Sequence, residues 1–210
     1  MITWLSNNYI EVIGAIAGLI YLYLEIKQNF WLWPLGFITS AFYVYIFYVS
    51  KFYADMGLQV YYLVISVYGL YHWLYGGNKG KIDSLKVTHV SKKQIFWLAI
   101  VTIVFFFVIE FILEQYTDSP VPIGDAFTTA LSITATWMLA RKIIEHWWLW
   151  VIVNAVSLGL YIYKGLYPTS VLFVFYTTMS FVGYYQWRKE MLRDYCVYNQ
   201  SSTKKQISTK

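Results

Sequence analysis

Seven long apolar stretches, separated by short polar segments, dominate the chain. A helix that spans a membrane needs about 20 largely apolar residues, and each stretch approaches that length. This pattern predicts an all-α integral membrane protein with seven transmembrane helices. The predicted helices are Tyr9–Ile26, Trp31–Val49, Met56–Tyr75, Ile95–Leu113, Pro122–Ala140, Trp147–Tyr163 and Thr169–Trp187.

The composition agrees with a lipid bilayer as the surrounding medium. Hydrophobic residues make up 59% and charged residues 13% of the 210 residues, whereas soluble domains carry about 25% charged residues. The 21 tyrosines and 10 tryptophans suit membrane interfaces and aromatic ligand pockets alike. Cys196 is the only cysteine, which excludes a disulfide framework. The net charge of +5 comes from loops rather than a compact basic face, so no nucleic-acid partner is expected.

The distribution of lysine and arginine predicts the orientation. With the N-terminus outside and the C-terminus in the cytoplasm of a bacterial inner membrane, 14 of the 16 basic residues fall on the cytoplasmic side. Only Lys51 and Lys164 then lie outside. Cytoplasmic loops are enriched in basic residues, and an error of one helix would scramble this segregation. The bias therefore favours both the count of seven and this orientation.

An internal repeat links the third and seventh helices at an offset of 114. Eight of 21 aligned positions are identical: Tyr53/Tyr167, Leu58/Leu172, Val60/Val174, Tyr62/Tyr176, Ser66/Ser180, Gly69/Gly183, Tyr71/Tyr185 and Trp73/Trp187. The second and sixth helices correspond more weakly, with Trp33 and Ser40 aligned to Trp150 and Ser157. The repeat predicts a 3+1+3 arrangement of parallel units, against the alternative that both halves are merely aromatic and apolar.

This arrangement divides the chain into four parts. Residues 1–93 form the first three-helix repeat with its cytoplasmic loop, and residues 94–121 form the linker helix. Residues 122–187 form the second repeat, and residues 188–210 form a polar cytoplasmic tail that we expect to be partly disordered. In transporters built from repeats, the substrate site lies at the repeat interface.

Polar side chains at membrane depth indicate where such a site lies, because they are costly in lipid. Trp147, Trp150, Asn154, Ser157 and Tyr161 share one face of the sixth helix. A flat, cationic heteroaromatic ligand could stack on these indoles and pair with the amide. The alternative is an interfacial tryptophan belt with an asparagine that bonds a neighbouring helix. Trp147, with Trp148, is the residue for which the belt interpretation is strongest.

Further candidates lie on the second and third predicted helices. Gln59, Tyr62 and Ser66 share a face, and Trp33, Thr39 and Ser40 are the polar or aromatic candidates of the second helix. For all of them, contacts between helices are the alternative to a binding role. The fifth helix carries the hydroxyl residues Thr128, Thr129, Ser132, Thr134 and Thr136, which we expect to bond mainly within their own helix.

Signatures of catalysis and of cofactor binding are missing from the sequence. It contains neither a P-loop nor a GxSxG motif, and its three histidines, expected to be solvated, follow no metal-binding pattern. We therefore expect neither an enzyme nor a cofactor. We also find no ionisable residue placed convincingly at mid-membrane, which favours transport that is not coupled to an ion.

Four segments carry a resemblance to a known family. They are Asn29–Gly36 (NFWLWPLG), Ser50–Gln59 (SKFYADMGLQ), Trp147–Asn154 (WWLWVIVN) and Tyr163–Tyr167 (YKGLY). Together they resemble the PnuC family of bacterial nicotinamide riboside transporters over nearly the whole chain except the tail. The resemblance implies a fold like that of SWEET sugar transporters and facilitated diffusion of the riboside, which cytoplasmic kinases then trap by phosphorylation.

The resemblance also implies the site residues. It assigns Trp150, Asn154 and Gln59 to the substrate site, with Trp147 in support. The chain departs from the family at Ile38-Thr39-Ser40, where members often have an asparagine. A hydroxyl in place of an amide changes the hydrogen bonds that a ligand can make, so a thiamine or other vitamin carrier is the alternative within the class. A membrane scaffold is the alternative outside it, and a homo-oligomer is left open.

Overall fold

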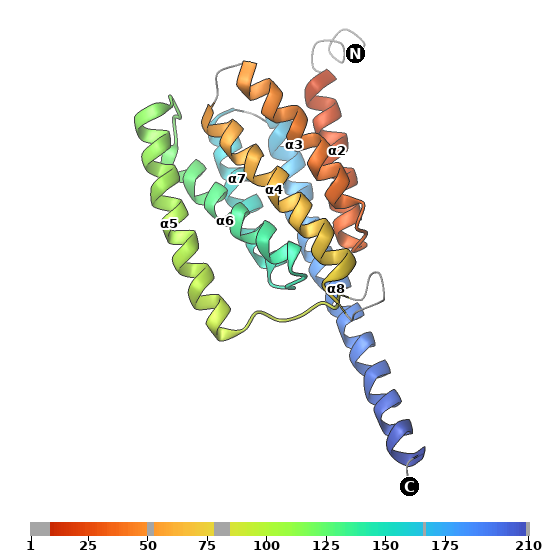
Figure 1. Ribbon diagram of the computed structural model, residues 1–210. Helices are drawn as coiled ribbons and strands as arrows, with labels where there is room; N and C mark the ends of the chain where they lie inside the picture. The colour runs from red at the N-terminus through yellow and green to blue at the C-terminus, as the bar shows by residue number, and fades with distance from the viewer. Residues whose placement is uncertain (1–8, 50–52, 78–84, 166, 209–210) are drawn as a thin grey trace.

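A bundle of α-helices forms the part of the chain that the computed structural model describes, residues 9–49, 53–77, 85–165 and 167–208 (Figure 1). Seven helices lie in these ranges, whose only β-structure is one isolated bridge between Thr88 and Ile143. The helices are α2 (Tyr9–Ile26), α3 (Leu32–Val49), α4 (Tyr53–Tyr75), α5 (Lys92–Tyr116), α6 (Pro122–Ala140), α7 (His146–Tyr163) and α8 (Tyr167–Ser208). The predicted all-α fold with seven helices is confirmed.

The helix bounds differ most from the prediction at α5 and α8. Helix α5 begins at Lys92 because Ser91 caps it. The Ser91 hydroxyl accepts a hydrogen bond from the backbone N–H of Gln94, and the Gln94 side-chain oxygen accepts one from the backbone N–H of Ser91. Helix α8 continues to Ser208, far beyond the predicted Trp187. The predicted end of this helix at Trp187 was therefore wrong, and the partial disorder of the tail stays a prediction. The segment after Trp187 is polar but contains neither glycine nor proline to end a helix.

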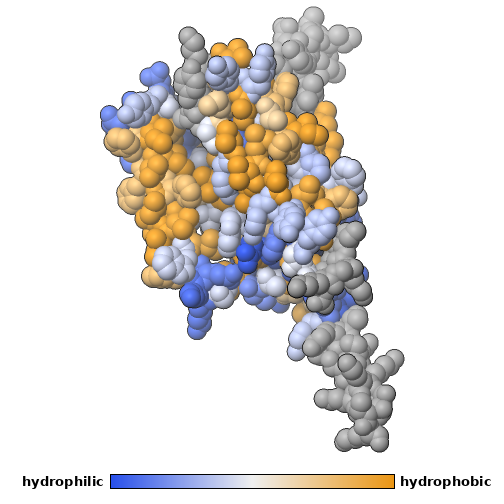
Figure 2. Space-filling model, viewed as in Figure 1, coloured by the Kyte–Doolittle hydropathy of each residue, from blue (hydrophilic) through white to orange (hydrophobic). Residues whose placement is uncertain are grey.

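Long apolar helices give the molecule a surface suited to lipid. Within the described residues, three helices are long and apolar enough to span a membrane by length and composition alone: Leu32–Val49, Lys92–Tyr116 and His146–Tyr163. Within α2, the segment Ala15–Ile26 is apolar but shorter. Figure 2 shows apolar side chains covering the middle of the visible face, with hydrophilic ones near its lower end and at its upper left. The other helices are less apolar because they carry tyrosine, serine and threonine, many of which face the interior.

The helices pack in a reciprocal pattern. Helix α3 lies along α4, and α7 lies along α8. Between the two sequence halves, α4 packs against α6, and α2 packs against α8. Helix α5 lies beside α6 at the edge of the bundle (Figure 1), and it has no fully buried residue. The side chains of α5 are therefore turned largely toward the surroundings of the bundle.

Equivalent contacts recur in the two halves at a separation of 114 residues. Trp33 packs edge to face on Trp73 with ring centroids 5.6 Å apart, and Trp147 packs in the same way on Trp187 at 5.9 Å. Each first tryptophan also lies against a glycine, Gly69 for Trp33 and Gly183 for Trp147. These contacts match Trp33 with Trp147 rather than with Trp150, so the predicted alignment of the second and sixth helices was wrong by three residues.

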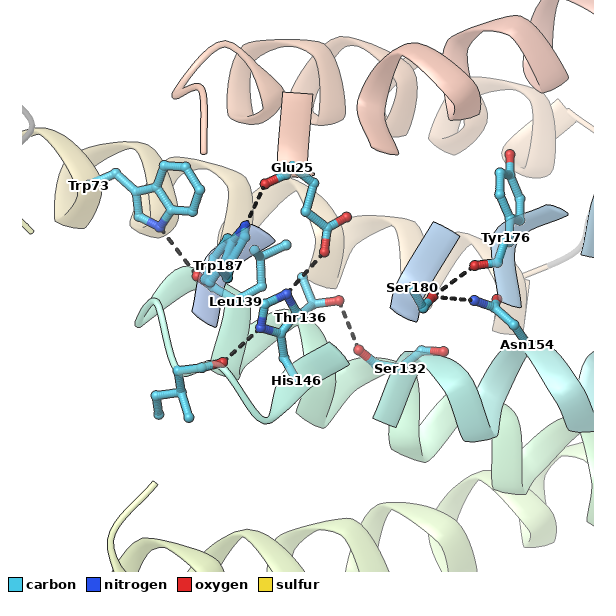
Figure 3. Close-up of polar contacts among 11 residues, drawn as sticks. Glu25, Trp73, Ser132, Thr136, Leu139, His146, Asn154, Tyr176, Ser180 and Trp187 are labelled. Atoms are coloured by element: carbon cyan, nitrogen blue, oxygen red, sulfur yellow. Dashed lines mark hydrogen bonds and ion pairs between the residues drawn. The ribbon is translucent and has the colours of Figure 1, made fainter. Parts of the chain in front are cut away.

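The turns that follow α2 and α6 repeat the same geometry. Gln28 and Lys142 both adopt a left-handed conformation, with φ of 51° and 50°. Just before each turn, a backbone carbonyl accepts an indole N–H from a distant helix, as Figure 3 shows. Trp187 Nε1 donates to Glu25 at 3.0 Å, and Trp73 Nε1 donates to Leu139 at 3.2 Å. Glu25 and Leu139 are also 114 residues apart, so they occupy matching positions.

The tightest packing lies at the end of the bundle where α2 ends and α7 begins. Four tryptophans, Trp33, Trp73, Trp147 and Trp187, are each no more than 1% exposed. Leu32, Leu139 and Ile144 complete this cluster without exposure to solvent. In the predicted orientation this aromatic cluster lies at the cytoplasmic end, where it closes the interior of the bundle.

Candidate functional site

A cavity of about 480 Å³ lies in the interior of the bundle, above the aromatic cluster. Helices α2, α3, α4, α6, α7 and α8 all contribute to its wall, whereas α5 does not. The wall therefore draws on both sequence halves. A volume of this size is typical of pockets that bind small organic molecules.

Of the residues that the sequence singled out on α3, α4 and α7, eight main candidates lie on the wall of this one cavity: Trp33, Thr39, Ser40, Gln59, Tyr62, Trp147, Trp150 and Asn154. Ser66 and Ser157 line it as well, whereas Tyr161 does not. The eight candidates come from α3, α4 and α7, so the fold brings together residues up to 121 positions apart. Their role in binding a substrate stays a prediction. The interfacial belt proposed for Trp147 is wrong, because this indole is only 1% exposed, whereas Trp148 is 45% exposed.

Three indole N–H groups of the wall are buried without a hydrogen-bond partner. They belong to Trp33, Trp147 and Trp150, and no acceptor lies within reach of them among the described residues. A buried donor without an acceptor costs roughly 1–3 kcal/mol. All three residues line the cavity, but their N–H groups are inaccessible from it, so other ring atoms are what a ligand contacts.

Asn154 supplies an oriented amide. The side chain is 7% exposed, and its Nδ2 donates to the Ser180 hydroxyl of α8 at 3.3 Å (Figure 3). The Ser180 hydroxyl in turn donates to the Tyr176 carbonyl at 2.8 Å, so the acceptor for the amide is itself fixed. Asn154 thus bonds a neighbouring helix and lines the cavity at the same time, and the two interpretations of this residue do not exclude one another.

Hydroxyl groups complete much of the wall. Thr39 donates to the Leu35 carbonyl of its own helix at 2.6 Å, and Ser40 is 6% exposed. On α6, the expected bonding within the helix is present: Thr128, Ser132, Thr134 and Thr136 each donate to the carbonyl four residues earlier. Sequence reasoning nevertheless missed that four α6 residues, Thr128, Thr129, Ser132 and Thr136, also line the cavity.

A buried carboxyl group at the end of the cavity next to the aromatic cluster also escaped the sequence analysis. Glu25 is 4% exposed and lines the cavity, and its Oε1 lies 3.2 Å from Nε2 of the fully buried His146 (Figure 3). The expectation of solvated histidines was therefore wrong for His146, whereas the His89 side chain is 63% exposed. Glu25 lies one residue before the end of α2 and two before Lys27, so its position alone suggested an interfacial residue.

The wall of the cavity therefore combines aromatic rings, amides, hydroxyl groups and the carboxyl group of Glu25. Flat ring systems stack on indoles, and a positive charge on the ring adds a cation–π contribution. Amides pair with carboxamides or hydroxyls through both a donor and an acceptor. Such a wall suits a small, flat, polar molecule with several hydrogen-bonding groups.

Comparison with known proteins places the chain among vitamin carriers. The family described as nicotinamide mononucleotide transporter matches residues 8–189. The chain is 26% identical over 204 residues to the nicotinamide riboside transporter PnuC of Escherichia coli (strain K12), covering 86% of this chain and 85% of that protein. It is also 26% identical over 188 residues to the riboflavin/roseoflavin transporter RibM of Streptomyces davaonensis, covering 88% of this chain and 86% of the relative.

A solved structure shares the fold. The crystal structure of the vitamin B3 transporter PnuC aligns with a TM-score of 0.70 over 91% of this chain and 85% of the other, at 22% sequence identity. At this identity the likeness concerns the fold, and the chemistry of the cavity must be argued from the residues present here.

Proposed function

Because this chain belongs to the PnuC family of nicotinamide mononucleotide transporters, which are multi-pass proteins of bacterial inner membranes, we propose that it carries nicotinamide riboside into the cell. The observation that carries this proposal is the position of three indole side chains on the wall of one cavity with the amides of Asn154 and Gln59. In the proposed complex, the pyridinium ring stacks on indole, the ring carboxamide pairs with a side-chain amide, and the ribose hydroxyls bond hydroxyl groups of the wall.

Two alternatives differ in what they require of the cavity. A scaffold without transport activity needs no internal space, so a polar cavity bounded by Gln59 and Asn154 favours a carrier. Within the carriers, the relative RibM is named for riboflavin, and thiamine is a second flat heteroaromatic vitamin. Thr39 and Ser40, which stand where PnuC members often have an asparagine, make the choice of vitamin a question for experiment.

Binding to the purified protein tests the proposal. We expect nicotinamide riboside to quench the fluorescence of the cavity tryptophans saturably, and to bind more tightly than thiamine or riboflavin measured side by side. Nicotinamide mononucleotide is a useful further ligand, because its phosphate would have to enter a cavity whose described wall residues include no lysine or arginine. Tighter binding of thiamine or riboflavin than of the riboside would refute the proposed substrate.

Facilitated diffusion with trapping by phosphorylation remains our proposal for the driving force. The sequence argument for it was the lack of an ionisable residue at mid-membrane, and Glu25, which lines the cavity one residue before the end of α2, weakens that argument. The proposal rests mainly on the family resemblance. A lack of dependence of riboside uptake on the proton gradient, in vesicles without a kinase, is the result it requires.

We further propose the 3+1+3 arrangement, with α2–α4 and α6–α8 as parallel units and α5 as the linker. The matching contacts of Trp33 with Trp73 and of Trp147 with Trp187 support it, as do the matching turns at Gln28 and Lys142. The reciprocal packing of α4 on α6 and α2 on α8 is what two units related by a two-fold axis would give.

The proposed orientation can be tested with the chain's only cysteine. Cys196 is exposed on α8, beyond the apolar part of that helix. With the C-terminus in the cytoplasm, we expect a membrane-impermeant maleimide to label it in inverted vesicles and not in intact spheroplasts. The variant Cys196→Ser/Asp118→Cys moves the thiol to the exposed loop between α5 and α6 and should reverse the pattern. Labelling of Cys196 in spheroplasts would contradict the orientation.

A further inference from the structure

Glu25 places an acidic side chain in the cavity wall. Among the described residues that line the cavity, no other is an aspartate, glutamate, lysine, arginine or histidine. Glu25 is nevertheless 4% exposed, in a setting where a carboxylate is costly unless it is paired. A buried carboxylate at this position therefore needs a functional explanation.

Packing does not explain the carboxylate, because the other half of the molecule has leucine at the matching position. The matching position 114 residues later is Leu139, which accepts an indole N–H with its carbonyl just as Glu25 does. Likewise, the position that matches His146 is Leu32. Both leucines are fully buried in the aromatic cluster. The matching contact in the other half is thus made by two leucines, so this part of the fold does not in itself require a carboxylate and an imidazole.

His146 contacts the Glu25 carboxylate on the side away from the cavity. Its Nδ1 lies 2.7 Å from the Ile143 carbonyl, which can only accept, so Nδ1 carries a proton and donates. Its Nε2 lies 3.2 Å from Glu25 Oε1, and the imidazole is fully buried and does not line the cavity. The carboxylate thus lies between the imidazole and the cavity.

The other charged groups at this end of the bundle lie outside the cavity wall. The Lys142 ammonium lies 4.5 Å from the Trp73 ring centroid, and the Glu190 carboxylate accepts a hydrogen bond from the Gln28 side chain. Neither residue lines the cavity. A charged Glu25 carboxylate requires a proton on His146 Nε2, so an imidazolium lies behind it on the side away from the cavity. A ligand in the cavity therefore faces the carboxylate end of this ion pair, and no lysine or arginine is present among the described residues of the wall.

We propose that Glu25 is the charge-selecting residue of the cavity: its carboxylate, positioned by His146, makes the cavity prefer a cationic heteroaromatic ring over a neutral ring of the same shape. This inference rests on the proposed transport function and specifies its substrate class. The indole faces of Trp33, Trp147 and Trp150 supply the stacking surface, and Glu25 supplies the opposite charge at the cytoplasmic end. In a low-dielectric cavity such a charge acts over several ångströms.

A pair of ligands that differ in ring charge tests the proposal. Nicotinamide riboside carries a pyridinium, and its reduced 1,4-dihydro form keeps the ribose and the carboxamide on an uncharged ring. Calorimetric titration of the purified protein is expected to show tighter binding of the cation. Glu25→Gln, which keeps size and polarity, should weaken binding of the cation about tenfold and leave binding of the dihydro form within about twofold. An equal loss for both ligands, or no loss, overturns the proposal.

Two control variants separate charge selection from loss of folding. Glu145→Gln removes a negative charge next to His146, yet the Glu145 carboxylate bonds His89 and the Val90 amide away from the cavity, so the preference for the cation should remain. Glu25→Leu/His146→Leu installs the leucine pair of the other half. It should keep the unfolding temperature of the wild type and lose the preference. Loss of the preference in Glu145→Gln, or its persistence in the double variant, overturns the proposal.

The proposed function and the role of Glu25 fail in different ways. Wild-type protein that binds neither riboside refutes the proposed substrate. The same comparison is then made with thiamine and its uncharged thiophene analogue, in which carbon replaces the charged ring nitrogen. A selective loss of the charged ligand in Glu25→Gln supports the role of Glu25 with either vitamin, and a wild type that binds none of the four ligands overturns both proposals.

Discussion

Asn154→Ala is expected to lower uptake of nicotinamide riboside about a hundredfold while the protein still inserts into the membrane. The amide is buried, lines the cavity, and is held by Ser180 at 3.3 Å. A site built to hydrogen-bond its substrate loses much of its affinity for that substrate when one partner is removed, because the substrate group is then buried without a hydrogen bond. Uptake of labelled riboside, normalised to the amount of protein in the membrane, measures the effect.

Two further variants make this experiment specific. Ser180→Ala removes the acceptor that orients the amide but leaves the amide in place, so we expect an intermediate loss of about tenfold. Thr178→Val changes a hydroxyl on the exposed side of α8, where the side chain bonds only the Val174 carbonyl of its own helix, and uptake should be unchanged. Wild-type uptake by Asn154→Ala would remove this residue from the site.

The sequence predicted the site through helical faces, and that reasoning held where a face was unambiguous. Asn154 and Trp150 on α7, and Gln59 and Tyr62 on α4, were placed together by spacing, and all four line the cavity. A polar residue surrounded by apolar ones must turn away from lipid, which leaves the interior as its only position. The same argument explains why the two helices could be oriented without knowledge of how they pack.

Other residues of the wall could not be recognised in this way. Thr128 and Ser132 satisfy their hydroxyls within α6, so their sequence pattern is the same whether they face lipid, a helix or a cavity. Glu25 lies next to the end of α2, where a carboxylate normally reaches water. It becomes buried only because α7 and α8 pack over it, as the contacts of His146 and Trp187 show. Burial of this kind depends on tertiary structure.

The register of the repeat was misjudged for a related reason. Both Trp147 and Trp150 match Trp33 in residue type, and Ser40 can be aligned with Ser157 by identity. The contacts show that Trp147 is the residue equivalent to Trp33. Trp147 packs against Gly183 and Trp187 in the way that Trp33 packs against Gly69 and Trp73. Ser40 then corresponds to Asn154, so the chain has a hydroxyl in one half where it has the amide in the other. Residue identity alone could not reveal this asymmetry.

Gly183→Ala is expected to destabilise the protein by about 1–3 kcal/mol, as overpacking of a tightly filled interior does. A Cβ at this position would lie 2.3 Å from Cη2 of Trp147. The indole cannot swing away easily, because it is 1% exposed and packs against Trp187 with centroids 5.9 Å apart. A lower unfolding temperature of the detergent-solubilised protein measures the effect. Since Trp147 also lines the cavity, riboside binding should weaken as well.

The repeat supplies both a replicate and a control for this substitution. At Gly69, a Cβ would lie 2.5 Å from Cε2 of Trp33, so Gly69→Ala should cause a loss of similar size through the other half of the aromatic cluster. At Gly159 of α7, a Cβ would meet nothing within 4 Å, and Gly159→Ala should keep or raise the unfolding temperature, because alanine favours the helix. Equal unfolding temperatures for all three variants would contradict the close approach of helix backbone and indole on which the closed end of the cavity depends.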